Sequence, residues 1–215
     1  MMRDGLFPPC RLGAAVIAAC AVACAAAAQS PASTITEQAR AAIVKAQQAQ
    51  GAATAYSVRF TMVDLADGGT SSGVLKFVAP DRYHFVSDQN GDEAVRIGNE
   101  GFVRKAHAKT WETEPPELVR ILENYRGPDR VGTQGVSTEG FAYVGETHAG
   151  AAEFDVYRYQ AVRLGERHRI MVWIGRPDGL PRQYQDETDL GYSRTRRTWI
   201  VTYDPSLQIL EPKVR

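Results

Sequence analysis

The side chains best suited to chemistry in this sequence are four histidines and two pairs of carboxylates. The histidines occur singly in separate predicted strands or turns, where such residues more often belong to a polar face than to a metal site; they are His84, His107, His148 and His168. Glu112 and Glu114, like Glu153 and Asp155, lie two residues apart, which places both carboxylates on one face of a strand. That spacing suits acid–base catalysis and a solvated surface equally well, and we expect the solvated surface.

Motifs of established catalytic chemistry are absent from the sequence. It contains no G-x-S-x-G, no H-E-x-x-H, no phosphate-binding P-loop and no G-x-G-x-x-G. The three cysteines, Cys10, Cys20 and Cys24, all lie in the first 28 residues, so a chain cleaved after this leader has no thiol nucleophile and no disulfide. We therefore expect no catalytic residue, no metal and no cofactor.

The leader has the features of an export signal. Two arginines precede a small-residue apolar stretch at residues 12–24, and Ala26-Ala27-Ala28 fits the pattern that signal peptidase cleaves. The stretch is too short for a membrane-spanning helix, which needs roughly 20 residues. We predict a signal peptide at 1–28, a polar joint at 29–33 and one exported domain at 34–215.

A second interpretation of the leader is lipidation. Ile17-Ala18-Ala19-Cys20 resembles a lipobox, in which Cys20 becomes the acylated first residue of a membrane-anchored lipoprotein. The apolar run before Cys20 is short for this purpose. The sequence therefore favours a periplasmic protein and leaves the anchored form as the alternative.

Charge gives no argument for a nucleic-acid partner. The chain has 25 basic and 25 acidic side chains, but arginines gather in its last third. They either form a solvated strand face that discourages edge pairing, or a surface for anionic lipid headgroups or an envelope protein. These arginines are Arg158, Arg163, Arg167, Arg169, Arg176, Arg182, Arg194, Arg196 and Arg197.

The hydrophobic pattern predicts one helix followed by many strands. Thr34 to Glu37 has the spacing of a capping box, and apolar residues recur at helical spacing from Ile35 until Gly51. From Tyr56 onward the period changes to two, with turn residues between the runs. The unbroken apolar run at 170–174 predicts a strand that is covered on both faces. We expect a mainly β domain: a curved sheet of about ten strands forming an incomplete antiparallel barrel, with an N-terminal helix.

One short helix interrupts the strands. Pro115-Pro116-Glu117 favours a helix start, and Gly127-Pro128 favours its end. Between them, apolar residues recur at i, i+3, i+4 and i+7, which predicts an amphipathic inserted helix with the face Leu118, Ile121, Leu122 and Tyr125. We expect this helix to be a movable lid.

The predicted strands carry more apolar surface than one alanine-rich helix can easily cover. In one interpretation these side chains pack an ordinary core with the inserted helix. In the other they line a cavity for a lipid or acyl chain, because such a site needs apolar walls and few hydrogen bonds. The candidate wall residues are Tyr56, Val58, Phe60, Met62, Leu75, Phe77, Tyr83, Phe85, Phe102 and Trp173.

Taken in order, the elements resemble the LolA-like family of periplasmic lipoprotein- or lipid-binding proteins, which includes LolA, LolB, LppX-type and outer membrane lipoprotein-sorting proteins. The resemblance extends over nearly the whole chain after the leader. It is carried by the capped helix, the hairpin at 74–85, the turn and strand at 97–102, Trp111 with the Leu-rich helix after it, the hairpin at 167–185 and the tail at 203–212.

The resemblance implies a monomeric carrier that shelters acyl chains of lipids or lipoproteins without catalysis. A related branch, similar to RseB, implies the alternative of a sensor or interaction module with a filled core. One residue departs from the pattern: LolA has a basic residue before the hairpin proline that helps to latch the lid, and this chain has Ala79 before Pro80. Arg82 is the candidate substitute, as a latch or as a contact to a lipid headgroup.

Overall fold

The computed structural model describes residues 31–115, 117, 120–191 and 193–214. The predicted signal peptide, its cleavage site and lipidation at Cys20 lie outside the described residues. In the described part of the chain, no helix has the length and apolar character needed to cross a membrane.

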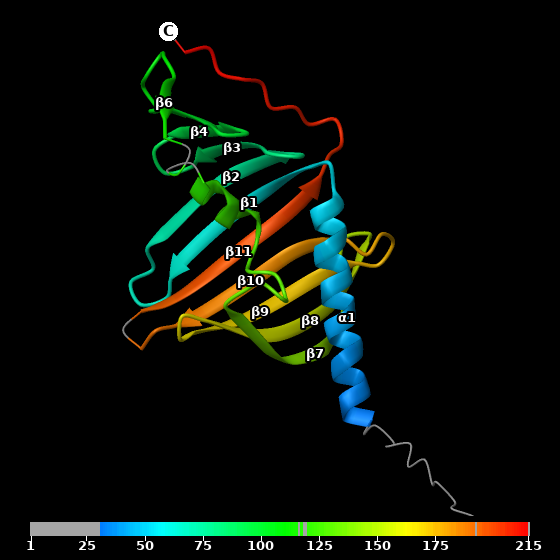
Figure 1. Cartoon of the computed structure of the whole chain (residues 1–215). Helices are drawn as coiled ribbons and strands as arrows, with labels where there is room; N and C mark the ends of the chain where they lie inside the picture. Colours follow the sequence, from blue (N-terminus) through cyan, green and yellow to red (C-terminus); the bar gives the residue numbers. More distant parts are fainter. Residues whose placement is uncertain (1–30, 116, 118–119, 192, 215) are drawn as a thin grey trace, which may run out of the picture.

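Eleven antiparallel strands form one curved, unclosed sheet (Figure 1), which confirms the predicted architecture. The spatial order is β6-β5-β4-β3-β2-β1-β11-β10-β9-β8-β7, so the first and last strands pair in the middle and β6 and β7 are the edges. The strands are β1 (Ala55–Asp64), β2 (Thr70–Val78), β3 (Arg82–Ser87), β4 (Glu93–Ile97), β5 (Glu100–Arg104), β6 (Glu112–Glu114), β7 (Val136–Ala149), β8 (Ala152–Arg163), β9 (Glu166–Gly175), β10 (Pro181–Asp189) and β11 (Arg194–Tyr203).

The N-terminal helix, α1 (Pro31–Ala52), packs against β7 and β10. It begins three residues before the predicted capping box at Thr34, because proline is well suited to the first turn of a helix, where its missing N–H has no partner to lose. Its buried apolar side chains are Ile43 and the small Ala39 and Ala46, and the two alanines let the helix lie close to the sheet. Figure 1 shows that α1 covers only the β7–β10 part, which leaves the β1–β5 part to other elements.

The predicted inserted helix is shorter and tighter than expected. The chain forms the 3₁₀-helix η1 (Arg120–Arg126), and Leu118 lies outside the described residues. Residues three apart stack on one side of a 3₁₀-helix. Leu122 and Tyr125 therefore face the sheet together, whereas Ile121 is 55% exposed.

Most apolar side chains of the strands gather in one core on the concave face, beneath α1 and η1. A small second cluster of Val95, Phe102 and Ile209 joins the sheet to the C-terminal tail, which runs back toward β6 (Figure 1). The prediction that residues 170–174 are covered on both faces is wrong. Ile170, Val172 and Ile174 are buried on the concave face, but Met171 and Trp173 alternate with them and are only half-buried on the other face.

Candidate functional site

Eight of the ten predicted wall residues come together on the concave face of β1, β2 and β3. Strand pairing sets Val58 beside Leu75, Leu75 beside Phe85, and Phe77 beside Tyr83, so that their side chains form one layer. The eight residues, all in or against the main core, are Tyr56, Val58, Phe60, Met62, Leu75, Phe77, Tyr83 and Phe85. The sequence periodicity therefore predicted correctly that these side chains share one face of the sheet.

The structure places the other two predicted wall residues on the opposite face. Phe102 lies under the C-terminal tail with Val95 and Ile209, and Trp173 is paired with Val156 on the uncovered side of β9. Both follow from strand alternation, because one residue of displacement along a strand reverses the face that a side chain occupies. Phe102 and Trp173 do not line the concave side.

The inserted segment is seated directly on this wall. The Tyr125 ring stacks on Phe85 with ring centroids 4.5 Å apart and meets Phe60 edge-on at 4.9 Å. Leu122 is 2% exposed and completes the contact. The site between β1–β3 and η1 is thus filled by protein side chains, as the ordinary-core interpretation requires.

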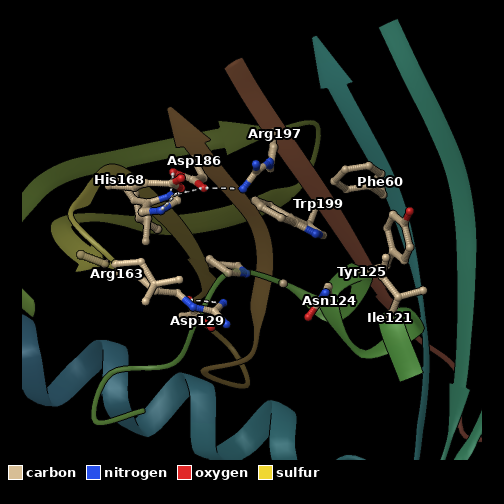
Figure 2. A pocket seen from close by; sticks show the side chains of 16 residues that line it. Phe60, Ile121, Asn124, Tyr125, Asp129, Arg163, His168, Asp186, Arg197 and Trp199 are labelled. Carbon is tan, nitrogen blue, oxygen red and sulfur yellow. Dashed lines mark hydrogen bonds and ion pairs between the residues drawn. The ribbon is translucent and has the colours of Figure 1, made fainter. Parts of the chain in front are cut away.

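An open cavity of about 360 Å³ lies beside this filled region, between residues 121–129 and strands β8–β11. Phe60 and Tyr125 belong to both regions, so the cavity is continuous with the predicted wall. Figure 2 shows the inserted segment on one side of the cavity and charged side chains on the other. The apolar lining includes Ile121, Ala161, Ile170 and Trp199, and the polar lining includes Asn124, Asp129, Arg163, Glu166, His168, Asp186 and Arg197.

Arg126, at the end of η1, fastens the inserted segment to the sheet. Its Nε donates a hydrogen bond to the Tyr56 hydroxyl at 2.6 Å, and its Nη1 reaches the Tyr83 hydroxyl at 3.5 Å. The guanidinium carbon also lies 4.1 Å from the centre of the Phe77 ring, a cation–π distance. Burial raises the pKa of Tyr56 above its ordinary value of 10, although Arg126 opposes the shift. The hydroxyl therefore stays protonated near neutral pH.

A second polar contact holds the same segment. Arg96, on β4, forms an ion pair with Glu123 of η1, and its guanidinium lies 5.4 Å from the centre of the Tyr83 ring. The side chain of Arg96 is 14% exposed, so this pair is partly shielded from water. Arg126 and Glu123 together form what we call the latch, with Arg96, Tyr56 and Tyr83 as its sheet partners.

Arg82, the residue predicted as a latch, contacts a different element. Its Nη1 donates a hydrogen bond to the backbone carbonyl of Ile209 at 2.9 Å and so fixes the C-terminal tail. The contacts between the inserted segment and the sheet use two other arginines, Arg126 from the segment and Arg96 from the sheet.

A third polar attachment ties the chain after η1 to α1. The backbone N–H of Val131 donates to Gln47 Oε1 at 2.9 Å, and Gln50 Nε2 donates to the carbonyl of Arg126 at 3.2 Å. The hydroxyl of Tyr184 donates to Gln50 Oε1 at 2.8 Å. Burial raises the pKa of Tyr184 well above its ordinary value, which keeps this donor protonated. Residues 126–131 are therefore held at both their α1 side and their sheet side.

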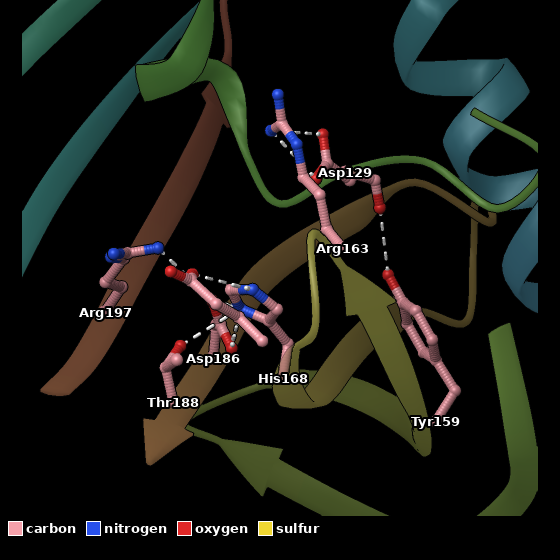
Figure 3. A network of polar contacts seen from close by, with 8 residues as sticks. Asp129, Tyr159, Arg163, His168, Asp186, Thr188 and Arg197 are labelled. Atoms are coloured by element: carbon pink, nitrogen blue, oxygen red, sulfur yellow. Dashed lines mark hydrogen bonds and ion pairs between the residues drawn. The ribbon is translucent and has the colours of Figure 1, made fainter. Parts of the chain in front are cut away.

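The distal end of the cavity is built around one buried carboxylate, Asp186 (Figure 3). His168 Nδ1 lies 3.0 Å from Asp186 Oδ2, and Arg197 Nη1 lies 3.6 Å from the same oxygen. Strand pairing explains the group, because Arg197 is beside Asp186 and His168 is beside Thr188. A buried carboxylate needs such partners, since leaving it unpaired in the interior would cost several kcal/mol.

The geometry of His168 does not resemble a hydrolytic triad. In a triad the nucleophile and the carboxylate contact opposite nitrogens of the imidazole ring. Here Thr188 Oγ1, at 3.0 Å, and Asp186 both contact Nδ1, while Nε2 has Glu166 3.9 Å away. Thr188 is therefore not placed for deprotonation by the other ring nitrogen.

The predicted carboxylate pair Glu153 and Asp155 belongs to a cluster of surface ion pairs. Arg176 bridges the predicted pair Glu153 and Asp155, with distances of 3.8 and 3.1 Å, and also contacts Glu146. Six of the nine C-terminal arginines contact a carboxylate; Arg158, Arg167 and Arg169 have no such partner among the residues of the structure's described ranges. Across those ranges, no three His, Cys, Asp or Glu side chains gather in a way that could hold a metal ion.

Several site residues were not predicted from the sequence. Gln47 and Gln50 follow Ile43 and Ala46 at helical spacing, and Arg126 follows Leu122 by four residues, so a signal for these three existed. No signal in the sequence shows that Asp186 is buried and Glu187 is not, because nearly all residues of this strand are polar.

No protein-family model matches the sequence, and no match was found among curated proteins. Solved structures do match. LprF from Mycobacterium bovis aligns with a TM-score of 0.55 at 10% identity, covering 83% of this chain and 98% of that chain. The lipoprotein LppX from Mycobacterium tuberculosis aligns with a TM-score of 0.51 at 15% identity, covering 76% and 93%. The chain has a LolA-like fold. At these identities the similarity concerns the fold alone, and the fold implied by the sequence resemblance is confirmed.

Proposed function

We propose that this protein is an exported binding protein that shelters the acyl chain of a lipid or lipoprotein beneath the 121–129 segment, without catalysis. The observation that carries the proposal is the cavity of about 360 Å³ beside a continuous apolar wall, under a segment fastened by a few polar contacts. Its volume lies within the usual range for small-molecule sites. The LolA-like fold, whose members bind lipids or lipoproteins, supports the same function.

The energetics suit a carrier with a movable lid. Each buried CH₂ group contributes about 0.8 kcal/mol, so complete burial of a sixteen-carbon chain offers about 12 kcal/mol. The ring of Tyr125 and the side chain of Leu122 occupy part of the wall and must move before a chain of that length is covered. The cost of moving them lowers the net affinity, which allows release.

A second candidate is a sensor or interaction module with a filled core. The packing of Tyr125 on Phe85 and Phe60 favours it, because that part of the wall is already occupied. Arg158, Arg167 and Arg169, without carboxylate partners in the described chain, would then supply the surface for an acidic envelope protein. Substituting all three with glutamine should lower the recovery of such a partner from envelope extract and leave lipid binding unchanged.

Native mass spectrometry of the purified protein tests the carrier proposal. We expect mass increments of acyl lipids that exchange with added lipid. Ala161→Phe should abolish them, because Ala161 is 2% exposed and lines the cavity. Ala152→Phe, at the exposed first residue of β8, is the matched control and should retain them. A wild-type protein without bound or exchangeable lipid would refute the proposal.

A further inference from the structure

One buried donor at the cavity lacks an acceptor. Trp199, on β11, is 3% exposed, and no described residue accepts a hydrogen bond from its indole Nε1. An unpaired buried donor is costly, and buried polar groups are almost always paired. This indole N–H is therefore the natural attachment point for a group that is brought in by a ligand.

Trp199 stands at the boundary between the apolar and the polar lining. It pairs with Phe60 across β1 and with Tyr184 across β10, and its ring centroid lies 5.7 Å from that of Phe60. Figure 2 shows its indole between Arg197 and the Asn124–Tyr125 end of the inserted segment. A ligand whose chain lay along Phe60 and Tyr125 would bring the group at the end of that chain to Nε1.

The charges of the lining determine which group is acceptable. Arg163 is paired with Asp129 at 3.2 Å, and Arg197 lies 3.6 Å from Asp186. Glu166, the remaining charged side chain of the lining, has only His168 nearby, at 3.9 Å. Two arginines of the lining therefore stand against three carboxylates, so that, with His168 counted as neutral, the formal charge of the lining is negative and disfavours an anionic carboxylate or phosphate.

We propose that Trp199 Nε1 donates a hydrogen bond to the carbonyl oxygen of a neutral acyl ester, so that the site selects esterified chains over free fatty acids and alkyl phosphates. This inference rests on the proposed function, because it names the ligand class of the same cavity. The indole is covered in the closed state, so the 121–125 segment moves aside when the ester enters. The ester can come from a neutral glycerolipid or from the diacylglyceryl group of a lipoprotein.

The indole N–H resonances of the ¹⁵N-tryptophan-labelled protein test this assignment. Probes are methyl palmitate, palmitate at pH 8, hexadecyl phosphate and a diacylglyceryl-cysteine peptide. We expect either ester to shift the Trp199 resonance downfield and the Trp173 resonance to stay in place, since Trp173 is on the opposite face. Tighter binding of the diacylglyceryl-cysteine peptide would indicate a lipoprotein as the source of the ester, and tighter binding of methyl palmitate would indicate a neutral lipid. Trp173→Phe and Trp111→Phe assign the signals by elimination, so the assignment does not depend on a variant of Trp199.

Affinities complete the test. Trp199→Phe should weaken methyl palmitate binding about three- to tenfold, the usual effect of one neutral hydrogen bond, and leave palmitate binding unchanged. Trp173→Phe is the matched control and should change neither affinity. Ester binding that leaves the Trp199 resonance unmoved, or palmitate binding as tightly as the ester, overturns the inference while leaving the carrier proposal standing. Failure of every probe to bind refutes both.

Discussion

The Arg126 side chain connects the inserted segment to three aromatic residues of the wall. Arg126 contacts Tyr56, Tyr83 and Phe77 at once, and these three residues come from the central strands of the apolar face. Hydrogen bonds that involve a charged group are stronger than neutral ones, and the aromatic faces add a cation–π contribution. We infer that Arg126 largely sets how often the segment leaves the sheet.

Replacing Arg126 tests this role. Arg126→Gln removes the positive charge and one of the two donors. It should destabilise the closed segment relative to the open one by about 1 kcal/mol, which corresponds to roughly fivefold faster exchange of bound lipid. Lipid transfer between vesicles, followed by fluorescence, measures the rate. Arg120→Gln is the control, because Arg120 is exposed at the other end of η1. Equal exchange rates in the two variants would remove Arg126 from the latch.

Glu93 gives the fold a predictable dependence on acid. Burial alone would raise the pKa of Glu93, but hydrogen bonds from Arg104 and His84 outweigh it, and the net pKa is below the ordinary value of 4.5. A folded-state pKa below the unfolded value stabilises the protein above pH 4.5, and this stabilisation is lost as the pH falls through the folded-state value.

The corresponding variant is Glu93→Gln. It should lower the free energy of unfolding by about 1 kcal/mol at pH 7 and much less at pH 3, so that its stability depends less on pH than that of the wild type. Urea unfolding at several pH values measures the difference. Glu100→Gln, at the exposed start of β5, serves as the control. Parallel pH profiles for wild type and Glu93→Gln would contradict the assignment.

At the scale of elements, the sequence predicted the type of each helix or strand better than the face on which its side chains lie. Alternating side chains predicted the β2–β3 hairpin and the concave placement of Leu75, Phe77, Tyr83 and Phe85, because a buried face imposes a period of two. It did not predict the faces of Phe102 and Trp173. Trp173 stands in an apolar run without alternation, and the C-terminal tail that covers Phe102 comes from more than a hundred residues away.

The inserted segment should open independently of the sheet. Leu122 is the buried residue of η1, whereas its neighbour Ile121 is 55% exposed. Leu122→Ala should therefore stabilise the open segment relative to the closed one by about 2 kcal/mol, a roughly thirtyfold loss of hydrogen-exchange protection in residues 120–130. Ile121→Ala should change protection little. If Leu122→Ala lowered protection across the whole sheet equally, the segment would be part of the global fold and not a lid.

At the scale of the molecule, the chain order explains how wall, lid and cavity arise together. Five strands run outward from β1, the chain then crosses the concave face as η1 and residues 127–135, and five strands return from the other edge to β11. The crossing segment therefore has to lie over the middle of the sheet. The sequence predicted a curved open sheet interrupted by one inserted helix, but not the central pairing of β1 with β11, the buried Asp186 group or the latch, because contacts between residues far apart in sequence leave no local pattern.

The central claim is that ligand enters only when the 121–129 segment moves, and locking that segment tests it most directly. In a chain that begins at Gln29, which has no native cysteine, Arg96→Cys and Glu123→Cys can be joined by a short reducible bifunctional reagent across the observed ion pair. Arg59→Cys with Asp88→Cys, joined across an exposed ion pair outside the cavity, is the matched control. We predict that the lock at 96 and 123 abolishes lipid uptake until reductant is added, while the control takes up lipid at the wild-type rate. Undiminished uptake by the locked protein would contradict the account.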